Sequence, residues 1–180
     1  MALIPLAVVA SPPVEAKRTA ARPALGYLRG KQINGIHILP SSFRDIRAVR
    51  ALEKACFGRD AWGYGELIFV YGAFGAVRLK AVADGRLIGF VAGEPRTAEG
   101  FAWISTIGVH PEYQQRGIGS RLLSQCEAGL TESSIKLTVR ASNTPAIALY
   151  RRFGYEEADR WPGYYAGGEA GILMEKKRGE

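Results

Sequence analysis

QQRGIGS, residues 114–120, joins an apolar, strand-like run at residues 103–109 to a helix-like run at residues 121–130. The two glycines of this segment allow the backbone to approach a bulky anion closely. A helix that follows directly turns unpaired N–H groups and the positive end of its dipole toward that anion. We interpret the segment as a binding loop for a pyrophosphate. A strand, a glycine loop and a helix in this order predict a nucleotide-type cofactor.

The same loop is also compatible with a plain strand-to-helix turn, in which the glycines allow the backbone to turn tightly and Arg116 adds solubility. It matches neither the dinucleotide fingerprint G-x-G-x-x-G nor the phosphate-binding loop G-x-x-x-x-G-K-[ST]. The sequence therefore gives no support to nucleotide-dependent redox chemistry or to ATP hydrolysis. It favours the phosphates of another cofactor.

A second segment, VRASNTPAIALYRRFGY at residues 139–155, follows the loop at the distance of one helix plus one strand. With both segments in place, the chain resembles the GNAT superfamily of acyl-CoA-dependent N-acetyltransferases. The loop pattern of that family is Q/R-x-x-G-x-G/A, and it is filled here by Gln114, Gly117 and Gly119. The second pattern is filled by Asn143, Ala146, Leu149, Tyr150, Gly154 and Tyr155. Within the superfamily this segment is most similar to the RimI type, the ribosomal-protein-alanine N-acetyltransferases, and GYYAGGEAGILM has a counterpart there. The resemblance covers about residues 36–176.

Length and composition agree with one domain of this kind. The chain has 180 residues, enough for one domain with a proper core and too few for two ordinary domains. Its two cysteines, Cys56 and Cys126, do not make a disulfide framework. We expect both to be reduced and structural, in an intracellular, cytoplasmic protein. No residues have metal-ligand spacing, so no metal site is expected.

The first 32 residues are expected to form a flexible extension ahead of an N-acetyltransferase domain at residues 33–180. Residues 1–10 are apolar, but they lack a basic leader, are far shorter than a membrane span and are followed by Pro12-Pro13. Through residue 35 the chain has five basic residues and one acidic residue, which gives +4 of the net charge of +7. A nucleic-acid arm and a solvated extension that touches acidic partners weakly both fit this charge. We favour the second, and expect neither specific nucleic-acid binding nor membrane association.

Strand-like and helix-like patterns alternate along the domain. The expected strands cover residues 33–39, 76–83, 86–93, 101–109, 135–140, 155–161 and 171–176, and the expected helices cover residues 41–56, 62–74, 121–130 and 145–154. Asp84-Gly85 predicts a tight hairpin, and Thr144 is placed to cap the last helix. The strand at 135–140 follows a crossover helix, so it should lie parallel to the strand at 101–109. The resemblance implies the same α/β fold: a GNAT-type mixed, mostly antiparallel sheet flanked by helices, with a parallel strand pair splayed at the acetyl-CoA site.

The resemblance also implies which residues bind acetyl-CoA. In the family, the backbone of the strand before the loop holds the pantetheine arm and offers an N–H to the oxyanion. Gly108 on this strand is expected to mark a bulge. Asn143 matches a cofactor-contacting position and fits equally a turn residue before a helix. The predicted cofactor-binding residues are Ile107, Gly108, Val109, Gln115, Arg116, Gly117, Ile118, Gly119, Ser120 and Asn143.

Tyr150 matches the general acid of the family. A tyrosine suits this role because its ordinary pKa of about 10 lies above the roughly 8.5 of a thiol, and it can protonate the departing sulfur. The alternative is a core aromatic residue that shares a helix face with Ala146 and Phe153. We favour the catalytic role.

Thr138 departs from the family pattern. The RimI type carries a glutamate at this strand position as general base, and a threonine hydroxyl does not accept a proton usefully at neutral pH. Candidate replacements are Glu66, Glu94 and His110, each of which also fits a purely structural position. Because an N-terminal α-amine loses its proton more easily than a lysine amine, we expect a protein N-terminus or a weakly basic small amine as acceptor.

Tyr164-Tyr165 resembles a tyrosine pair that lines the peptide groove in related N-terminal acetyltransferases, and fits equally a hairpin loop with exposed aromatics. We therefore expect an acetyl-CoA-dependent N-acetyltransferase that works by direct attack in a ternary complex. Its first expected acceptor is the N-terminal α-amine of a protein or peptide. The alternatives are N-acetylation of a small-molecule amine, such as an antibiotic or polyamine, and a catalytically weak acyl-CoA-binding module.

Overall fold

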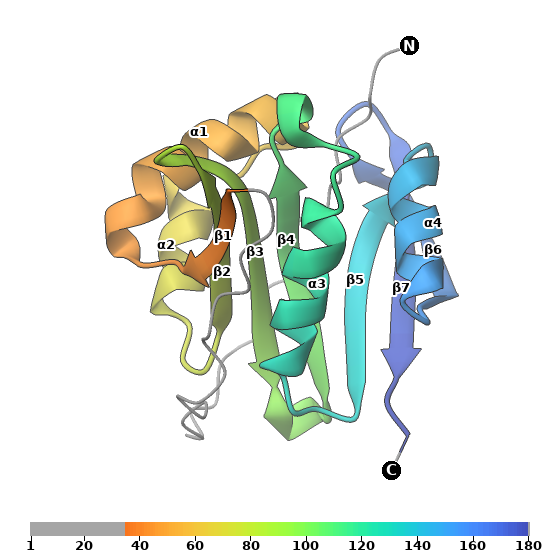
Figure 1. Cartoon of the computed structure of the whole chain (residues 1–180). Helices are drawn as coiled ribbons and strands as arrows, with labels where there is room; N and C mark the ends of the chain where they lie inside the picture. Colours follow the sequence, from red (N-terminus) through yellow and green to blue (C-terminus); the bar gives the residue numbers. More distant parts are fainter. Residues whose placement is uncertain (1–34, 180) are drawn as a thin grey trace.

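The computed structural model describes residues 35–179, so the predicted N-terminal extension lies outside the described residues. Seven strands form one sheet in the order β1-β2-β3-β4-β5-β7-β6 (Figure 1). All neighbouring strands are antiparallel except β4 and β5, which are parallel. The strands are β1 Ile36–Pro40, β2 Val77–Ala83, β3 Arg86–Arg96, β4 Phe101–Val109, β5 Ser134–Arg140, β6 Glu156–Tyr165 and β7 Glu169–Lys177. The helices are α1 Ile46–Phe57, α2 Tyr64–Gly72, α3 Ile118–Ala128 and α4 Thr144–Arg152. This is the mixed, mostly antiparallel sheet that the sequence predicts.

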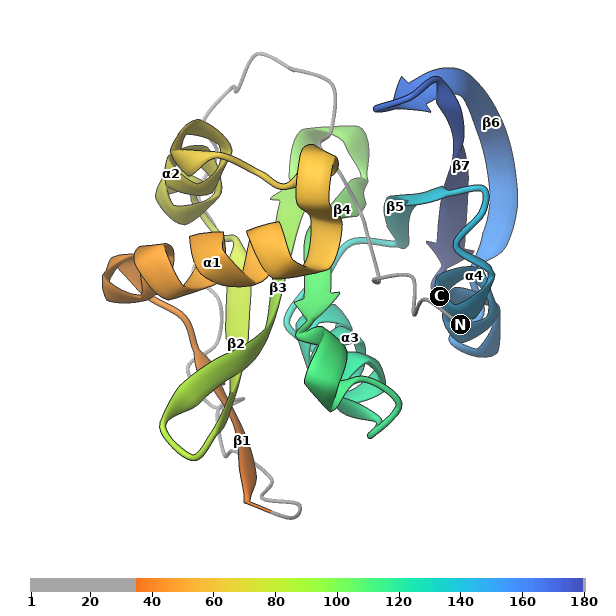
Figure 2. The same ribbon diagram turned by 90° about the horizontal axis from the view of Figure 1, so that it is seen from above.

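The helices cover the two faces of the sheet in pairs. Figure 2 shows α1 and α2 on one face and α3 and α4 on the other. A smaller apolar cluster, with Leu52, Phe57 and Phe90, lies between the sheet and the first pair. A larger one, with Ile107, Leu122 and Tyr150, lies under the second pair. Each face therefore has a core of its own.

Local signals predict most of these elements. Asp84 and Gly85 both adopt positive φ, at 48° and 72°, as a two-residue hairpin turn between twisted strands requires. α3 begins three residues before the predicted start at residue 121, because Gly117, with φ 75°, ends the preceding loop in a left-handed conformation. The predicted cap of α4 is wrong. Asn143 precedes the helix, and its side chain accepts a hydrogen bond from the backbone N–H of Ala146 at 3.2 Å, while Thr144 is already helical.

The strands β4 and β5 separate after a short parallel contact. Their paired residues are Phe101 with Ser134, Ala102 with Ile135 and Trp103 with Lys136, and no further pair exists along the described strands. This confirms the predicted splay. The bulge was expected at Gly108, which instead pairs regularly with Phe90. The extra residue is Ser105, because β3 pairs Ala92 with Thr106 and Gly93 with Ile104. The bulge therefore lies where β4 leaves β5.

No helix within residues 35–179 is long and apolar enough to cross a membrane.

Candidate active site

The glycine loop lies at the end of β4 and leads into α3. Gln115 and Gly117 adopt positive φ, at 61° and 75°, so the backbone turns sharply before the helix. The side chain of Gln114 donates a hydrogen bond to the carbonyl oxygen of Val109 at 3.0 Å, which ties the loop to the strand. Ile118, Gly119 and Ser120 form the first turn of α3. N–H groups of a first helical turn have no partner within the helix and are suited to bind an anion.

The three predicted strand positions, Ile107, Gly108 and Val109, lie on the part of β4 that has separated from β5. Along this part the edge of β4 that faces β5 makes no ladder with it, which leaves backbone groups for a ligand. The carbonyl oxygen of Val109 is the exception, because it accepts hydrogen bonds from Gln114 and Cys56. Packing at Gly108 leaves little room for a side chain. A Cβ atom there would lie 3.1 Å from the ring of Phe57 and 3.3 Å from the sulfur of Cys56.

Tyr150 lies on α4 and is fully buried in the same apolar cluster as Ile107 and Ile118. Its phenolic oxygen has no hydrogen-bond partner among the described residues. Burial, followed by the nearby phenol of Tyr165, raises its pKa well above the usual value, so the phenol keeps its proton at neutral pH. An unpaired buried hydroxyl costs free energy, which a hydrogen bond to a ligand or a water molecule would recover.

The position where the RimI type carries its glutamate holds a fully buried Thr138. Thr138 lies against Tyr164 of the β6–β7 hairpin. A Cβ atom added to Gly171 would lie 2.9 Å from Thr138 and also 2.9 Å from the Tyr164 ring. Burial raises the pKa of Tyr164, and the neighbouring Thr138 partly offsets this rise. The side chain of Thr138 therefore lies beside a phenol.

Two of the three predicted replacement bases lie away from this position. Glu66 is exposed, and its carboxylate accepts a hydrogen bond from the backbone N–H of Gly63 at 2.9 Å, which caps α2. His110 follows β4 on the side of the glycine loop, where its Nδ1 lies 3.6 Å from Glu112. Glu94 of β3 is buried, accepts a short hydrogen bond from Ser105 of the bulge and lies 3.8 Å from Arg96. Of the three candidates, the structure brings Glu94 to the point where β4 leaves β5.

Sequence reasoning missed Glu53, which is 2% exposed on α1. Its Oε1 accepts a hydrogen bond from the hydroxyl of Thr106 at 2.7 Å, and its Oε2 accepts one from the backbone N–H of Trp62 at 3.3 Å. Burial raises the pKa of Glu53 to about 7. A signal was present in the sequence, because Glu53 follows Val49 by one helical turn on the apolar stripe of α1.

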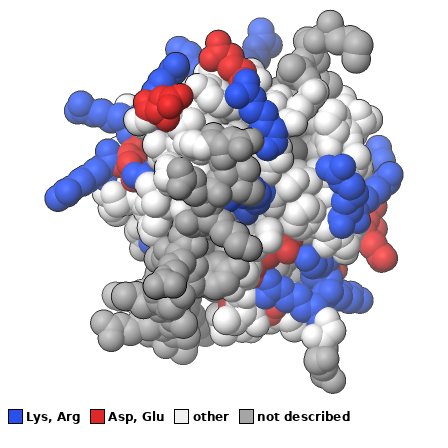
Figure 3. Space-filling view, viewed as in Figure 1, with Lys and Arg blue, Asp and Glu red and all other residues white. Residues whose placement is uncertain are grey.

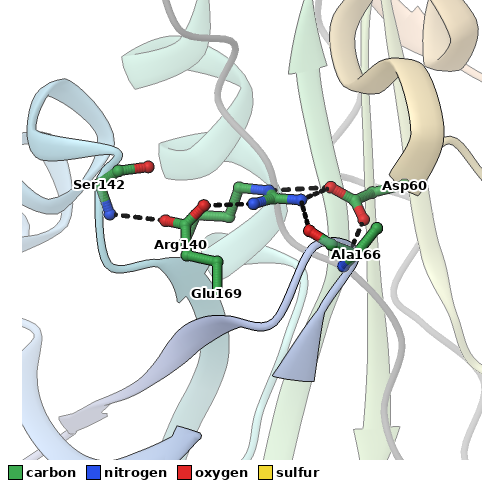
Figure 4. Close-up of polar contacts among 5 residues, drawn as sticks. All are labelled: Asp60, Arg140, Ser142, Ala166 and Glu169. Atoms are coloured by element: carbon green, nitrogen blue, oxygen red, sulfur yellow. Dashed lines mark hydrogen bonds and ion pairs between the residues drawn. The ribbon is translucent and has the colours of Figure 1, made fainter. Parts of the chain in front are cut away.

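Arg140, the last residue of β5, ties two loops together (Figure 4). Its guanidinium donates to Asp60 from the α1–α2 connection, with Nε to Oδ2 at 2.8 Å, and to Glu169 at the start of β7. It also donates to the carbonyl oxygen of Ala166 at 3.2 Å, while the N–H of Ala166 donates to Asp60 at 3.1 Å. We name the Asp60, Arg140, Ala166 and Glu169 contacts the Arg140 clasp.

Aromatic rings of the β6–β7 hairpin face β4 across the splay. Trp161 stacks on Trp103 with 6.5 Å between ring centroids, and Tyr164 lies 5.2 Å from Trp161. Of the predicted tyrosine pair, Tyr164 is half-buried and Tyr165 is buried, with the Arg140 guanidinium over its ring at 4.8 Å. These residues form one aromatic wall beside Thr138.

The predicted cofactor residues fit acetyl-CoA. The turn at Gly117 leaves open space around the loop, Arg116 is exposed there, and the buried phenol of Tyr150 needs a partner. Figure 3, in the view of Figure 1, shows basic side chains over α4 and over the loop into α3. Positive charge on both sides suits a ligand that carries several phosphates. No group of residues within 35–179 has the composition of a metal site.

Comparison with known proteins gives a consistent result. Residues 46–155 match the model of the acetyltransferase (GNAT) family. An uncharacterized N-acetyltransferase of Methanocaldococcus jannaschii is 30% identical over 141 residues, which cover 76% of this chain and 88% of that protein. The ribosomal protein bS18-alanine N-acetyltransferase of Salmonella typhimurium is 36% identical over 128 residues, which cover 68% of this chain and 77% of that protein. The crystal structure of the ribosomal-protein-S18-alanine N-acetyltransferase of Escherichia coli aligns with a TM-score of 0.70 at 26% identity, covering 81% of this chain and 97% of that one.

Proposed function

Since this chain belongs to the GNAT acetyltransferase family and is an acetyl-CoA-dependent N-acetyltransferase, we propose that its acceptor is the N-terminal α-amine of a protein or peptide. The observation that carries the choice of acceptor is the threonine at position 138. Where the RimI type has a carboxylate, this chain has a threonine side chain beside Tyr164. At pH 7, deprotonation costs roughly 1 kcal/mol for an α-amine of pKa about 7.8, against roughly 4.6 kcal/mol for a lysine amine. An acceptor amine that a weak base can deprotonate suits this site.

The residues around the splay have distinct roles in the reaction. Bound acetyl-CoA supplies a thioester whose carbonyl carbon is attacked by the amine and whose thiolate leaves. The loop from Gln115 to Ser120 holds the pyrophosphate with its backbone N–H groups. The free edge of β4 at Ile107, Gly108 and Val109 orients the pantetheine arm, and a backbone N–H there stabilises the oxyanion. Tyr150 holds the proton that the departing sulfur needs.

The acceptor side has the features of a peptide groove. With the cofactor loop and Tyr150 on the face of α3 and α4, the opposite face remains for the amine. There the aromatic wall of Trp161 and Tyr164 can pack on an extended peptide. Two relatives named as alanine N-acetyltransferases of a ribosomal protein support this acceptor class. The two buried, free thiols support the cytoplasmic location expected from the sequence.

Release of thiol from acetyl-CoA, followed with matched acceptors, tests the proposal. The panel holds a peptide with a free N-terminal alanine and no lysine, the same peptide N-acetylated with one lysine, a polyamine and an aminoglycoside. We expect the first to have a kcat/KM at least tenfold above the others. Preference for the lysine peptide contradicts the proposed acceptor, and preference for a polyamine or aminoglycoside favours the small-molecule alternative.

A further inference from the structure

Two buried carboxylates meet β4 where it leaves β5. Glu53 of α1 accepts a hydrogen bond from Thr106, and Glu94 of β3 accepts one from the adjacent Ser105. These hydroxyls belong to the bulge and to the residue after it, two and three positions beyond the last β4–β5 pair at Trp103. Both acids are therefore fixed to the part of β4 where the splay begins.

The other buried acids of the described residues lie elsewhere. Glu127 pairs with Lys176 at 2.7 Å, and Glu132 accepts a hydrogen bond from Thr97 at 3.1 Å. Neither bonds to β4. With the proposed cofactor loop and Tyr150 on the face of α3 and α4, the face of α1 and α2 is the one left for the acceptor amine. Glu53, on α1, belongs to that face.

The two acids differ in their partners. Glu94 forms an ion pair with the guanidinium of Arg96 at 3.8 Å and accepts the hydrogen bond from Ser105, so its carboxylate is already engaged by a cation. Glu53 has no ion pair within residues 35–179. Arg50 and Cys56 of its own helix act on it electrostatically, while β4 and the α1–α2 connection present only the hydroxyl of Thr106 and the backbone N–H of Trp62.

We propose that Glu53 is the general base of the reaction and replaces the glutamate whose position Thr138 occupies. The acceptor arrives as an ammonium ion. One N–H bond breaks, the proton passes through a water molecule to the carboxylate of Glu53, and the freed lone pair attacks the thioester carbonyl. The C–S bond of the tetrahedral intermediate then breaks, and Tyr150 protonates the departing sulfur. The nitrogen loses its second proton as the amide forms, and this proton restores the phenol of Tyr150. Glu53 finally releases its own proton to solvent. A base whose pKa is about 7 is matched to an α-amine near 7.8, as efficient proton transfer requires. This role rests on the proposed function, because it needs an acceptor that enters as an ammonium.

Glu53→Gln tests this role, with Glu94→Gln as the matched control that removes the neighbouring carboxylate. We expect E53Q to lower kcat about 100- to 1000-fold at pH 7, while KM for the acceptor and Kd for CoA change less than twofold. In wild type, kcat should decrease as the pH is lowered below 7, because Glu53 becomes protonated. This acidic limb of the pH profile of kcat should disappear in E53Q and remain in E94Q. A side chain that only fixes Trp62 to Thr106 would not give this limb.

Rescue separates a base from a structural contact. Thr138→Glu restores the carboxylate of the RimI type, so the double variant E53Q/T138E should recover at least tenfold of the lost kcat. Assays use whichever acceptor of the panel gives the fastest wild-type turnover, so failure of the proposed acceptor and failure of Glu53 give different results. An E53Q enzyme within threefold of wild type, with the same pH profile, overturns the role of Glu53. If E53Q does not fold, the pH dependence of kcat is measured in Glu53→Asp. The proposal requires that kcat of this variant still depends on a group that ionises near pH 7, and a profile without such a group overturns it.

Discussion

At the scale of the residue, Tyr150 combines complete burial with a hydroxyl that has no partner in the described part of the chain. Tyr150→Phe keeps the ring and removes only this hydroxyl. We expect kcat to fall about 100-fold or more, because the departing thiolate loses its proton donor, with Kd for CoA changed less than threefold. Thiol release and calorimetry measure the two quantities.

Tyr155 supplies a matched control for this substitution. It is also a buried phenol, and its ring lies 5.8 Å from that of Tyr150 in an edge-to-face arrangement. Tyr155→Phe should leave kcat within about twofold. Equal losses in both variants would show that the phenols act through packing and that Tyr150 is not the acid.

The pKa of Glu53 also predicts how stability depends on pH. Burial raises this pKa from 4.5 to about 7, so between these values the folded chain keeps a proton that the unfolded chain releases. Stability then falls as pH rises through this window, and the whole shift corresponds to about 3 kcal/mol. Urea unfolding at pH 5 and at pH 8 measures this effect. Between these pH values, the free energy of unfolding of wild type should fall by up to this amount relative to that of Glu53→Gln. A difference that does not change with pH would contradict the raised pKa.

At the scale of the element, the Arg140 clasp connects three segments that lie far apart in the sequence. Asp60 is 80 residues from Arg140, and Glu169 is 29 residues from it. The side chains of Asp60 and Arg140 are 8% and 18% exposed, so solvent screens the pair weakly. We expect the clasp to hold the α1–α2 connection and the β6–β7 hairpin at the spacing that a peptide needs between them.

Arg140→Ala should therefore affect both stability and acceptor binding. Loss of the guanidinium leaves Asp60 with an unpaired charge, which costs about 2 kcal/mol and lowers Tm by about 4–8 °C. A loosened groove that costs about 1 kcal/mol raises KM for the peptide about fivefold, with KM for acetyl-CoA unchanged. The exposed pair Arg160 and Glu157 is the control, since Arg160→Ala should shift Tm by less than about 2 °C. A rise in both KM values would contradict a role confined to the acceptor groove.

The elements also show what could be predicted from sequence. The β2–β3 turn, the bounds of β4 and the glycine loop depend on residues a few positions apart, and local patterns gave them. The bulge at Ser105 depends on the pairing of β3, and the bond between Glu53 and Thr106 joins residues 53 positions apart. Such contacts exist only after the sheet and α1 have packed together. For that reason the sequence suggested Glu66 and His110 as bases and missed Glu53.

At the scale of the whole molecule, the helix pairs lie on opposite faces of the sheet (Figure 2), and in the proposed reaction each substrate reaches the splay from its own face. The cofactor loop and Tyr150 belong to the face of α3 and α4, and Glu53 belongs to the face of α1 and α2. In the proposed mechanism both substrates are bound at once and meet where β4 leaves β5. This arrangement favours direct attack over transfer through an acetylated enzyme.

The thiols of the chain allow this conclusion to be tested. Cys56 lies beneath Gly108, donates a hydrogen bond to the carbonyl oxygen of Val109 at 3.3 Å, and has a pKa that burial raises to about 12. Cys126, the other cysteine, is fully buried and its pKa is also raised by burial. Neither forms a thiolate at neutral pH, and a thiolate is the form that accepts an acetyl group. When both substrate concentrations are varied, we expect double-reciprocal plots of the initial rate to give intersecting lines. Incubation with acetyl-CoA alone should leave no acetyl group on Cys56. In Cys56→Ala, kcat should stay within about threefold of wild type. Parallel lines in these plots, together with an acetylated Cys56, would instead establish a covalent intermediate. In that case the buried thiol of Cys56 would have to lose its proton in order to accept the acetyl group.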